Sequence, residues 1–213
     1  MLHYLQRSMQ KMQHFTEKEL DILRFFYENK KGHVRHIKKS VKLSEHTLLK
    51  YLHSLEKRKV LTSRREGNLK IYEINRKSEY LKIFFSYFDL VRLDALEYKR
   101  GKAIRTFVDL LKKDKFPFFV LLFGSTAKGN YTQKSDVDMI IVFDNLNKKT
   151  SQNVDEIKRK IRAETGLNVN IIIMKLGEFM REKDNKENYA LQDAIATGYP
   201  VFGNQLYYEV ILQ

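Results

Sequence analysis

Hydrophobic and polar positions follow three patterns along the chain, and each pattern predicts a different kind of element. Apolar residues recur at three- and four-residue spacing between residues 16 and 55, which predicts amphipathic helices. Two short stretches near residues 60 and 70 alternate with a period of two, as half-buried strands do. Residues 116–123 and 137–143 are almost continuously apolar, which is typical of buried strands. The fold class predicted is therefore α/β (α+β).

The N-terminal part begins with three predicted helices. Thr16 is expected to cap the first helix, Glu19 to complete a capping box, and residues 30–32 to end it. A second helix is expected over 34–42, and a turn with the next N-cap over 43–47. The buried stripe of the third helix consists of Leu48, Leu52 and Leu55.

Two strands over 60–63 and 70–74 are expected to form a hairpin that turns through residues 64–68, with Arg64 and Arg65 at its tip. Three helices followed by a basic hairpin resemble the winged helix-turn-helix regulators. The resemblance covers about residues 15–75. It implies binding to double-stranded DNA, with contact to another protein as the alternative role.

In that resemblance the third helix approaches the base edges in the major groove, and basic residues around it contact phosphates. The side chains expected to face base edges are Glu45, His46, Thr47 and Lys50. The side chains expected to neutralise phosphates are Lys38, Lys39, Arg64, Arg65 and Lys70.

The net charge of +14 is placed unevenly. Residues 1–116 carry 28 Lys and Arg against 14 Asp and Glu, whereas residues 117–213 carry 12 of each kind. This asymmetry indicates two modules with different partners, and nucleic acid is the partner expected for the basic module. Lysine that serves only solubility is the alternative.

Residues 77–115 are helical in pattern and too apolar for a flexible linker, with a break between two helices expected at Gly101. Such helices either pair two subunits, giving a homodimer that suits a palindromic DNA site, or cover the neighbouring sheet. The expected organisation is a DNA-binding domain over 1–76, a helical connector over 77–115 and a second domain over 116–213.

The second domain contains the most informative motif of the chain. An apolar strand ends in Gly124-Ser125, and after ten residues Asp136-Val-Asp138 opens a second strand. Alternate side chains of a strand share one face, so Asp136 and Asp138 can supply oxygen ligands to the same divalent metal. Gly124 lets a phosphate approach the backbone, and Ser125 starts a helix. A helix cap beside a solvated strand end is the simpler alternative.

These residues resemble the signature of the DNA polymerase beta-like nucleotidyltransferase superfamily, especially its minimal nucleotidyltransferase branch, and Lys128 and Ser135 fit that branch too. The resemblance implies a small mixed sheet, bound Mg²⁺ (or Mn²⁺) and an NTP, with ATP as the expected nucleotide. It implies transfer of a nucleoside monophosphate with loss of pyrophosphate. The nucleotide-binding residues would be Gly124, Ser125, Lys128 and Ser135.

The third carboxylate of this superfamily is expected on a later apolar strand, where the chain has Val169-Asn170-Ile171. The catalytic set is therefore Asp136, Asp138 and Asn170, with an amide where an acid is expected. In two-metal phosphoryl transfer the third carboxylate helps to hold the metal that activates the acceptor hydroxyl. The site is expected to bind nucleotide better than it turns it over.

Two functions stay open. The first is a DNA-bound transcription regulator whose nucleotidyltransferase-like domain senses nucleotide or retains weak transfer activity. The second is an antitoxin-type minimal nucleotidyltransferase that adenylylates a partner toxin protein.

Composition limits the other classes of function. The chain has no cysteine, which excludes thiol chemistry. All six histidines lie in the first 53 residues, which excludes a Ser-His-Asp site built around Ser125 within the second domain. The longest apolar run is too short to span a membrane, and residues 1–15 lack a secretory signal pattern. A cytoplasmic protein without a membrane partner is expected.

Overall fold

The computed structural model describes residues 14–212 and divides into two compact units, Met1–Phe88 and Asp89–Gln213. Each unit has a hydrophobic core of its own. Within residues 14–212, no helix has both the length and the apolar character that crossing a bilayer requires.

The N-terminal unit packs three helices against a small antiparallel sheet with the strand order β1-β3-β2. The elements are α2 (Glu17–Asn29), β1 (Lys31–His33), α3 (Val34–Ser40), α4 (Glu45–Lys57), β2 (Leu61–Glu66) and β3 (Leu69–Ile74). The predicted stripe of α4 is confirmed, since Leu48, Leu52 and Leu55 are all fully buried.

The capping box predicted at the first helix is confirmed. The backbone N–H of Glu19 donates to Thr16 Oγ1 at 3.2 Å, and the backbone N–H of Thr16 donates to the Glu19 carboxylate at 2.9 Å. The same carboxylate accepts from Arg58 at 3.0 Å, and the Arg58 guanidinium lies 3.7 Å from the centre of the Phe15 ring. A local capping residue therefore also ties α2 to the end of α4.

The helix end expected over 30–32 is confirmed, because α2 ends at Asn29 with Lys30 as its C-cap. A strand over 31–33 pairs with β3 and was not predicted, because three residues are too few to show a period in sequence. Three other expectations for this unit are wrong. The hairpin turn consists of Gly67 and Asn68 alone, since the ladder continues to Glu66 opposite Leu69. Arg64 and Arg65 therefore lie within β2 and not at the tip, and α3 ends at Ser40 rather than at residue 42.

The C-terminal unit has a four-stranded mixed sheet with the order β6-β5-β4-β7, in which only β5 and β6 are parallel. This confirms the predicted mixed α/β fold class. Helix α5 (Leu81–Asp94) spans the boundary of the two units. The following elements are α6 (Tyr98–Asp114), β4 (Phe119–Phe123), α7 (Gly124–Lys128), β5 (Val137–Phe143), α8 (Lys148–Thr165), β6 (Val169–Lys175), α9 (Leu176–Glu182), α10 (Tyr189–Thr197), β7 (Tyr199–Phe202) and α11 (Asn204–Ile211).

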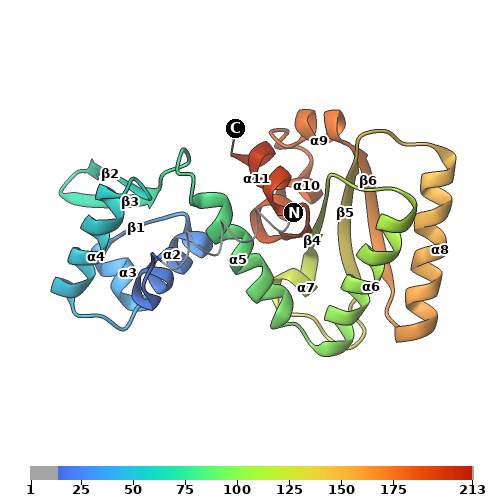
Figure 1. Cartoon of the computed structure of the whole chain (residues 1–213), viewed down its shortest axis with the longest axis horizontal. Helices are drawn as coiled ribbons and strands as arrows, with labels where there is room; N and C mark the ends of the chain where they lie inside the picture. The colour runs from blue at the N-terminus through green and yellow to red at the C-terminus, as the bar shows by residue number, and fades with distance from the viewer. Residues whose placement is uncertain (1–13, 213) are drawn as a thin grey trace. The chain divides into compact units, whose positions relative to one another are not determined.

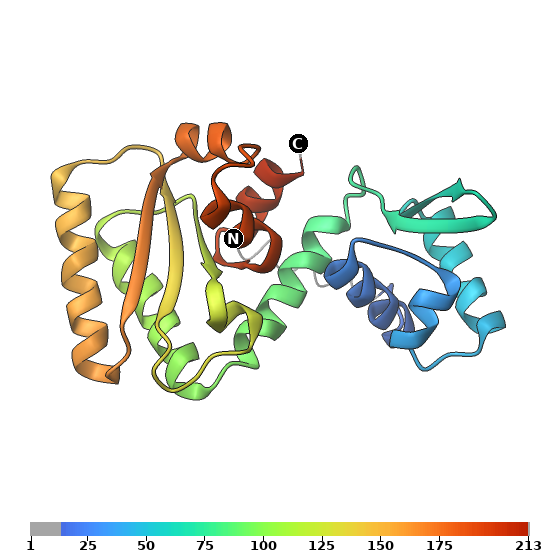
Figure 2. The same ribbon diagram turned by 180° about the vertical axis from the view of Figure 1, so that it is seen from behind.

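Helices α6 and α8 lie side by side and share one core with the sheet (Figures 1 and 2). Alternate residues of β5, beginning with Val137, are buried in that core, so Asp138 points to the opposite face of the sheet. The break expected at Gly101 is wrong. The chain leaves helical conformation at residues 95–97, and Gly101 is buried inside α6.

Candidate metal and nucleotide site

The two predicted carboxylates and the predicted third residue meet at one point. Strands β5 and β6 run parallel with Asp138 opposite Asn170, and Asp136 directly precedes β5. The Asn170 Nδ2 group donates to Asp136 Oδ2 and to Asp138 Oδ1, both at 3.1 Å. The oxygens of two carboxylates from one chain segment therefore converge on the amide of the neighbouring strand.

This donor set fits a divalent cation. Mg²⁺ and Mn²⁺ prefer carboxylate, carbonyl and water oxygens, and the Asn170 amide can contribute a neutral carbonyl oxygen in place of its N–H. In the part of the chain that the structure describes, no group of three or more His, Asp or Glu side chains is arranged to hold a metal. Asp136 and Asp138 are thus the acidic ligands that this site would use.

Gly124 closes the site from the side of β4. Its backbone has φ +69°, and a Cβ atom added there would lie 2.4 Å from Asp138 Oδ2. Only glycine therefore allows the start of α7 to pack directly against the Asp138 carboxylate. Ser125 follows as the second residue of α7 and is half-buried. The predicted Gly-Ser segment and the carboxylate pair are neighbours in space, as the spacing predicts.

The other two predicted nucleotide-binding residues are engaged elsewhere. The Lys128 ammonium lies 2.9 Å from both carboxylate oxygens of Asp193 in α10. Such exposed pairs stabilise a fold by less than about 1 kcal/mol, so a phosphate can compete for Lys128. The Ser135 hydroxyl accepts from the Thr132 backbone N–H at 2.9 Å and thereby closes a turn.

Arg100, which the sequence pattern does not single out, supports the loop that delivers Asp136. Its fully buried guanidinium donates to the carbonyl oxygens of Thr132 and Ser135 at 2.7 and 2.8 Å, and to Thr126 Oγ1 at 3.1 Å. Thr126 in turn donates to the Asp136 carbonyl at 3.2 Å. One arginine of α6 therefore connects α7 with the loop that precedes Asp136. A lone arginine among many basic helical residues carries no signal of this role.

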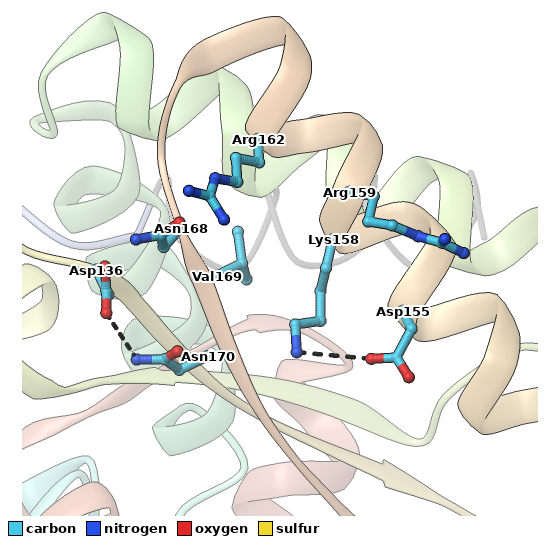
Figure 3. A pocket seen from close by; sticks show the side chains of 8 residues that line it. All are labelled: Asp136, Asp155, Lys158, Arg159, Arg162, Asn168, Val169 and Asn170. Atoms are coloured by element: carbon cyan, nitrogen blue, oxygen red, sulfur yellow. Dashed lines mark hydrogen bonds and ion pairs between the residues drawn. The ribbon is translucent and has the colours of Figure 1, made fainter.

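A pocket of about 510 Å³ lies next to the carboxylates (Figure 3). Its lining comes from the segment before β5, from the start of β6 and from one side of α8. The lining residues are Asp136, Asp155, Lys158, Arg159, Arg162, Asn168, Val169 and Asn170.

The side chains predicted to contact DNA all lie on the surface of the N-terminal unit, with Thr47 half-buried. The Thr47 hydroxyl lies 2.8 Å from Oγ of Ser44, the N-cap residue of α4, so Thr47 contributes to the hydrogen bonding at the start of that helix. Lys38 lies 3.9 Å from Glu45. Lys39, Lys50 and Arg65 form no ion pair with any residue between 14 and 212.

Two cations of the hairpin form three further ion pairs. Arg64 lies 2.9 Å from Glu66 and 2.7 Å from Glu73. Lys70 lies 2.9 Å from Glu56. The Ser63 hydroxyl and then Lys70 donate to Glu56 and lower the pKa of that carboxyl group, while Glu56 raises the pKa of Lys70. The charges predicted to meet phosphates are therefore partly compensated within the protein.

A family model described as a nucleotidyltransferase domain matches residues 103–195. That range contains Gly124, both aspartates and Asn170. The C-terminal unit thus carries a nucleotidyltransferase-like domain. The match confirms the resemblance at the level of this domain, whereas the winged helix-turn-helix interpretation stays a prediction. No curated protein matches the chain.

Three solved structures show distant similarity. The crystal structure of AF1382 from Archaeoglobus fulgidus is 20% identical over 41% of this chain and 99% of its own, with a TM-score of 0.33. A toxin-antitoxin with AMP-PNP is 19% identical over 50% of this chain and 78% of its own, with a TM-score of 0.36. TrmBL2, an archaeal chromatin protein described with a novel mode of DNA binding, is 14% identical over 89% of this chain and 78% of its own, with a TM-score of 0.30.

Proposed function

We propose that the protein binds double-stranded DNA through its N-terminal unit and binds an NTP on Mg²⁺ or Mn²⁺ in its nucleotidyltransferase-like domain. ATP is the nucleotide we expect. The bound nucleotide then serves mainly as a signal for transcription regulation, with nucleotidyl transfer as a weak residual activity. The observation that carries this proposal is the neutral Asn170 amide between Asp136 and Asp138.

The chemistry of the three residues explains the preference for binding over turnover. Two carboxylates suffice for a cation that bridges the phosphates of a triphosphate, and the bare backbone of Gly124 leaves room for those phosphates. A second cation, which would activate an acceptor hydroxyl, needs further negative charge. Asn170 supplies none, so activation of the hydroxyl is the step that the site performs poorly.

The DNA-binding part of the proposal rests on the arrangement of the N-terminal unit. Helices α3 and α4 are joined by a four-residue segment over 41–44, and the β2–β3 hairpin follows α4. In a winged helix-turn-helix, α4 would enter the major groove and the hairpin would be the wing. The proposed homodimer would present two such units to the two halves of a palindromic site.

The test compares nucleotide binding with nucleotide transfer in the wild type and in Asn170→Asp. Calorimetry with ATP and Mg²⁺ measures binding, and release of pyrophosphate together with labelling from the α-phosphate of ATP measures transfer. We expect the wild type to bind ATP only when the metal is present and to transfer the nucleotide slowly. Asn170→Asp should transfer it faster by about tenfold or more, because the substitution restores one anionic metal ligand. Asn168→Asp is the matched control, because it adds the same charge to the same pocket outside the Asp138 register.

Failure of the wild type to bind any nucleotide with metal would overturn the proposal. Fast transfer by the wild type would instead favour the second candidate, an enzyme that adenylylates a partner toxin protein. That outcome would mean that the Asn170 amide oxygen is sufficient for the second cation.

A further inference from the structure

Helix α8 presents cations to the pocket that contains Asp136 and Asn170. Lys158, Arg159 and Arg162 of α8 line it, opposite the first residues of β6. In Figure 3, the Lys158 and Arg162 side chains extend from the helix toward β6, whereas the Arg159 side chain points to the other side. We call this space the α8 pocket.

The cations of the α8 pocket are poorly compensated by the protein. Within the described range, Arg159 and Arg162 form no ion pair. Lys158 lies 3.6 Å from Asp155, whose side chain is 68% exposed, so this pair contributes little. A cation held by Asp136 and Asp138 would make the pocket still more positive. The pocket is therefore electrostatically suited to an anionic ligand.

The position of the pocket relative to the carboxylates indicates which ligand this is. Asp138 lies between Phe123 of β4, which precedes Gly124, and Asn170 of β6. In the proposed function the triphosphate lies on the Gly124 side. Phosphoryl transfer places the attacking oxygen and the leaving oxygen roughly in line, on opposite sides of the phosphorus. The β6 side, where the α8 pocket opens, is thus the side for the acceptor.

We infer that the α8 pocket binds a phosphate group of the acceptor, which is therefore a nucleotide or the end of a nucleic-acid strand. The role of the ligand as acceptor rests on the proposed function, whereas binding of phosphate does not. In a transfer, the acceptor hydroxyl oxygen bonds to the α-phosphorus of the NTP, the bond from that phosphorus to the pyrophosphate oxygen breaks, pyrophosphate leaves and the hydroxyl proton passes to solvent.

The test measures binding of phosphate probes by the full chain, saturated with Mg²⁺ and a non-hydrolysable ATP analogue. The probes are AMP and a single-stranded trinucleotide with a 5′-phosphate, which is too short to occupy a winged helix-turn-helix. The variant Lys158→Gln with Arg162→Gln removes the two cations that extend toward β6. The control Lys148→Gln with Lys160→Gln makes the same charge change on the same helix, at exposed positions outside the pocket.

We expect the pocket variant to bind the trinucleotide roughly tenfold more weakly than the wild type and the control to stay within about twofold. The dependence of log affinity on log salt should fall by about 1.4 for two lost contacts to a single strand. Tighter binding of the trinucleotide than of AMP would identify a nucleic-acid strand, and equal binding would identify a nucleotide.

Two results would overturn the inference: neither probe binds the wild type, or the pocket variant and the control bind alike. A wild type that fails to bind the ATP analogue would refute the proposed function separately. A tenfold difference between the two variants under those conditions would still support a phosphate pocket at α8.

Discussion

Both units contain cations with and without an acidic partner, and the two units differ in which of their cations are compensated. The N-terminal unit belongs to the basic part of the chain, yet Arg64, Lys70 and Lys38 each have an acidic partner. The C-terminal unit includes a segment over 117–213 without net charge, yet within the residues described Arg159 and Arg162 of its helix α8 have none. Net charge therefore shows which part of the chain is basic. Whether a given cation is free to bind an anionic ligand depends on which acidic side chains the fold places next to it.

One arginine in each unit illustrates a second difference, since Arg58 is partly exposed and Arg100 is fully buried. Arg58 in the N-terminal unit has a carboxylate partner, Glu19, and a ring partner, Phe15. Arg100 in the C-terminal unit donates mainly to backbone carbonyl oxygens, and it also lies 3.9 Å from the exposed Glu97 carboxylate and 4.4 Å from the centre of the Tyr131 ring. The first arrangement neutralises a charge, while the second uses a charge to hold a loop in place.

The largest expected effect separates the two units by function. Asp136→Asn with Asp138→Asn should abolish Mg²⁺-dependent nucleotide binding, because amides replace both anionic ligands. DNA affinity should stay within about twofold, since the change lies outside the N-terminal unit. Calorimetry with ATP measures nucleotide binding, and an electrophoretic mobility shift with duplex DNA measures DNA binding. Loss of both activities in a folded variant would contradict the separation of functions.

Arg100→Lys tests whether a buried cation holds the loop that precedes Asp136. An ammonium group cannot reach Thr126, Thr132 and Ser135 together, so buried acceptors lose their donors. We expect a loss of about 3 kcal/mol in the free energy of unfolding, measured by denaturant titration. Arg105→Lys, an exposed change on the same helix, should have an effect within about 0.5 kcal/mol. Equal effects would show that Arg100 has no special supporting role.

A smaller effect distinguishes compensated from available charge in the hairpin. Arg65 lies opposite Lys70 in the ladder and has no ion pair within residues 14–212, whereas Arg64 has two acidic partners. We expect Arg65→Ala to weaken DNA binding about fivefold and Arg64→Ala about twofold, with nucleotide binding unchanged. Fluorescence anisotropy at several salt concentrations measures both. A larger effect of Arg64→Ala would mean that DNA displaces its acidic partners.

The smallest effect concerns the core of the C-terminal unit at high pH. Burial raises the pKa of Tyr199 to about 12, above the value of roughly 10 in an unfolded chain. The unfolded state therefore releases this proton first, and stability present below pH 10 is lost as the pH rises toward 12.

Tyr199→Phe removes that loss. The hydroxyl group has no hydrogen-bond partner among the described residues, so stability at neutral pH should change by less than about 1 kcal/mol. Thermal melts from neutral pH to pH 11 check both expectations, with the exposed Tyr98→Phe as control. An unchanged alkaline loss of stability would assign it to Tyr207, whose pKa burial also raises.

Much of the candidate site follows from the sequence because strands repeat with a period of two. That period alone places Asp136 and Asp138 on one face. The family resemblance together with the apolar context of Asn170 places that residue on a later strand, and the structure shows that this strand is the neighbour of β5. The partner of Lys128 could not be predicted in the same way, because Asp193 is 65 residues away and its place depends on how α10 packs. The strand over 31–33 was missed for a similar reason, since its pairing with β3 defines it.

The sequence by itself determined most of the elements, the capping box at Thr16 and the carboxylate pair close in sequence to Gly124, because these depend on local spacing and on backbone preferences. Only the tertiary structure decided that Asn170 bridges the two aspartates and that Arg100 supports their loop. It also decided that Arg162, beside them, forms no ion pair with residues 14–212. Each of these depends on distances between segments far apart in the chain. Packing of the whole unit sets those distances, and no local pattern records them.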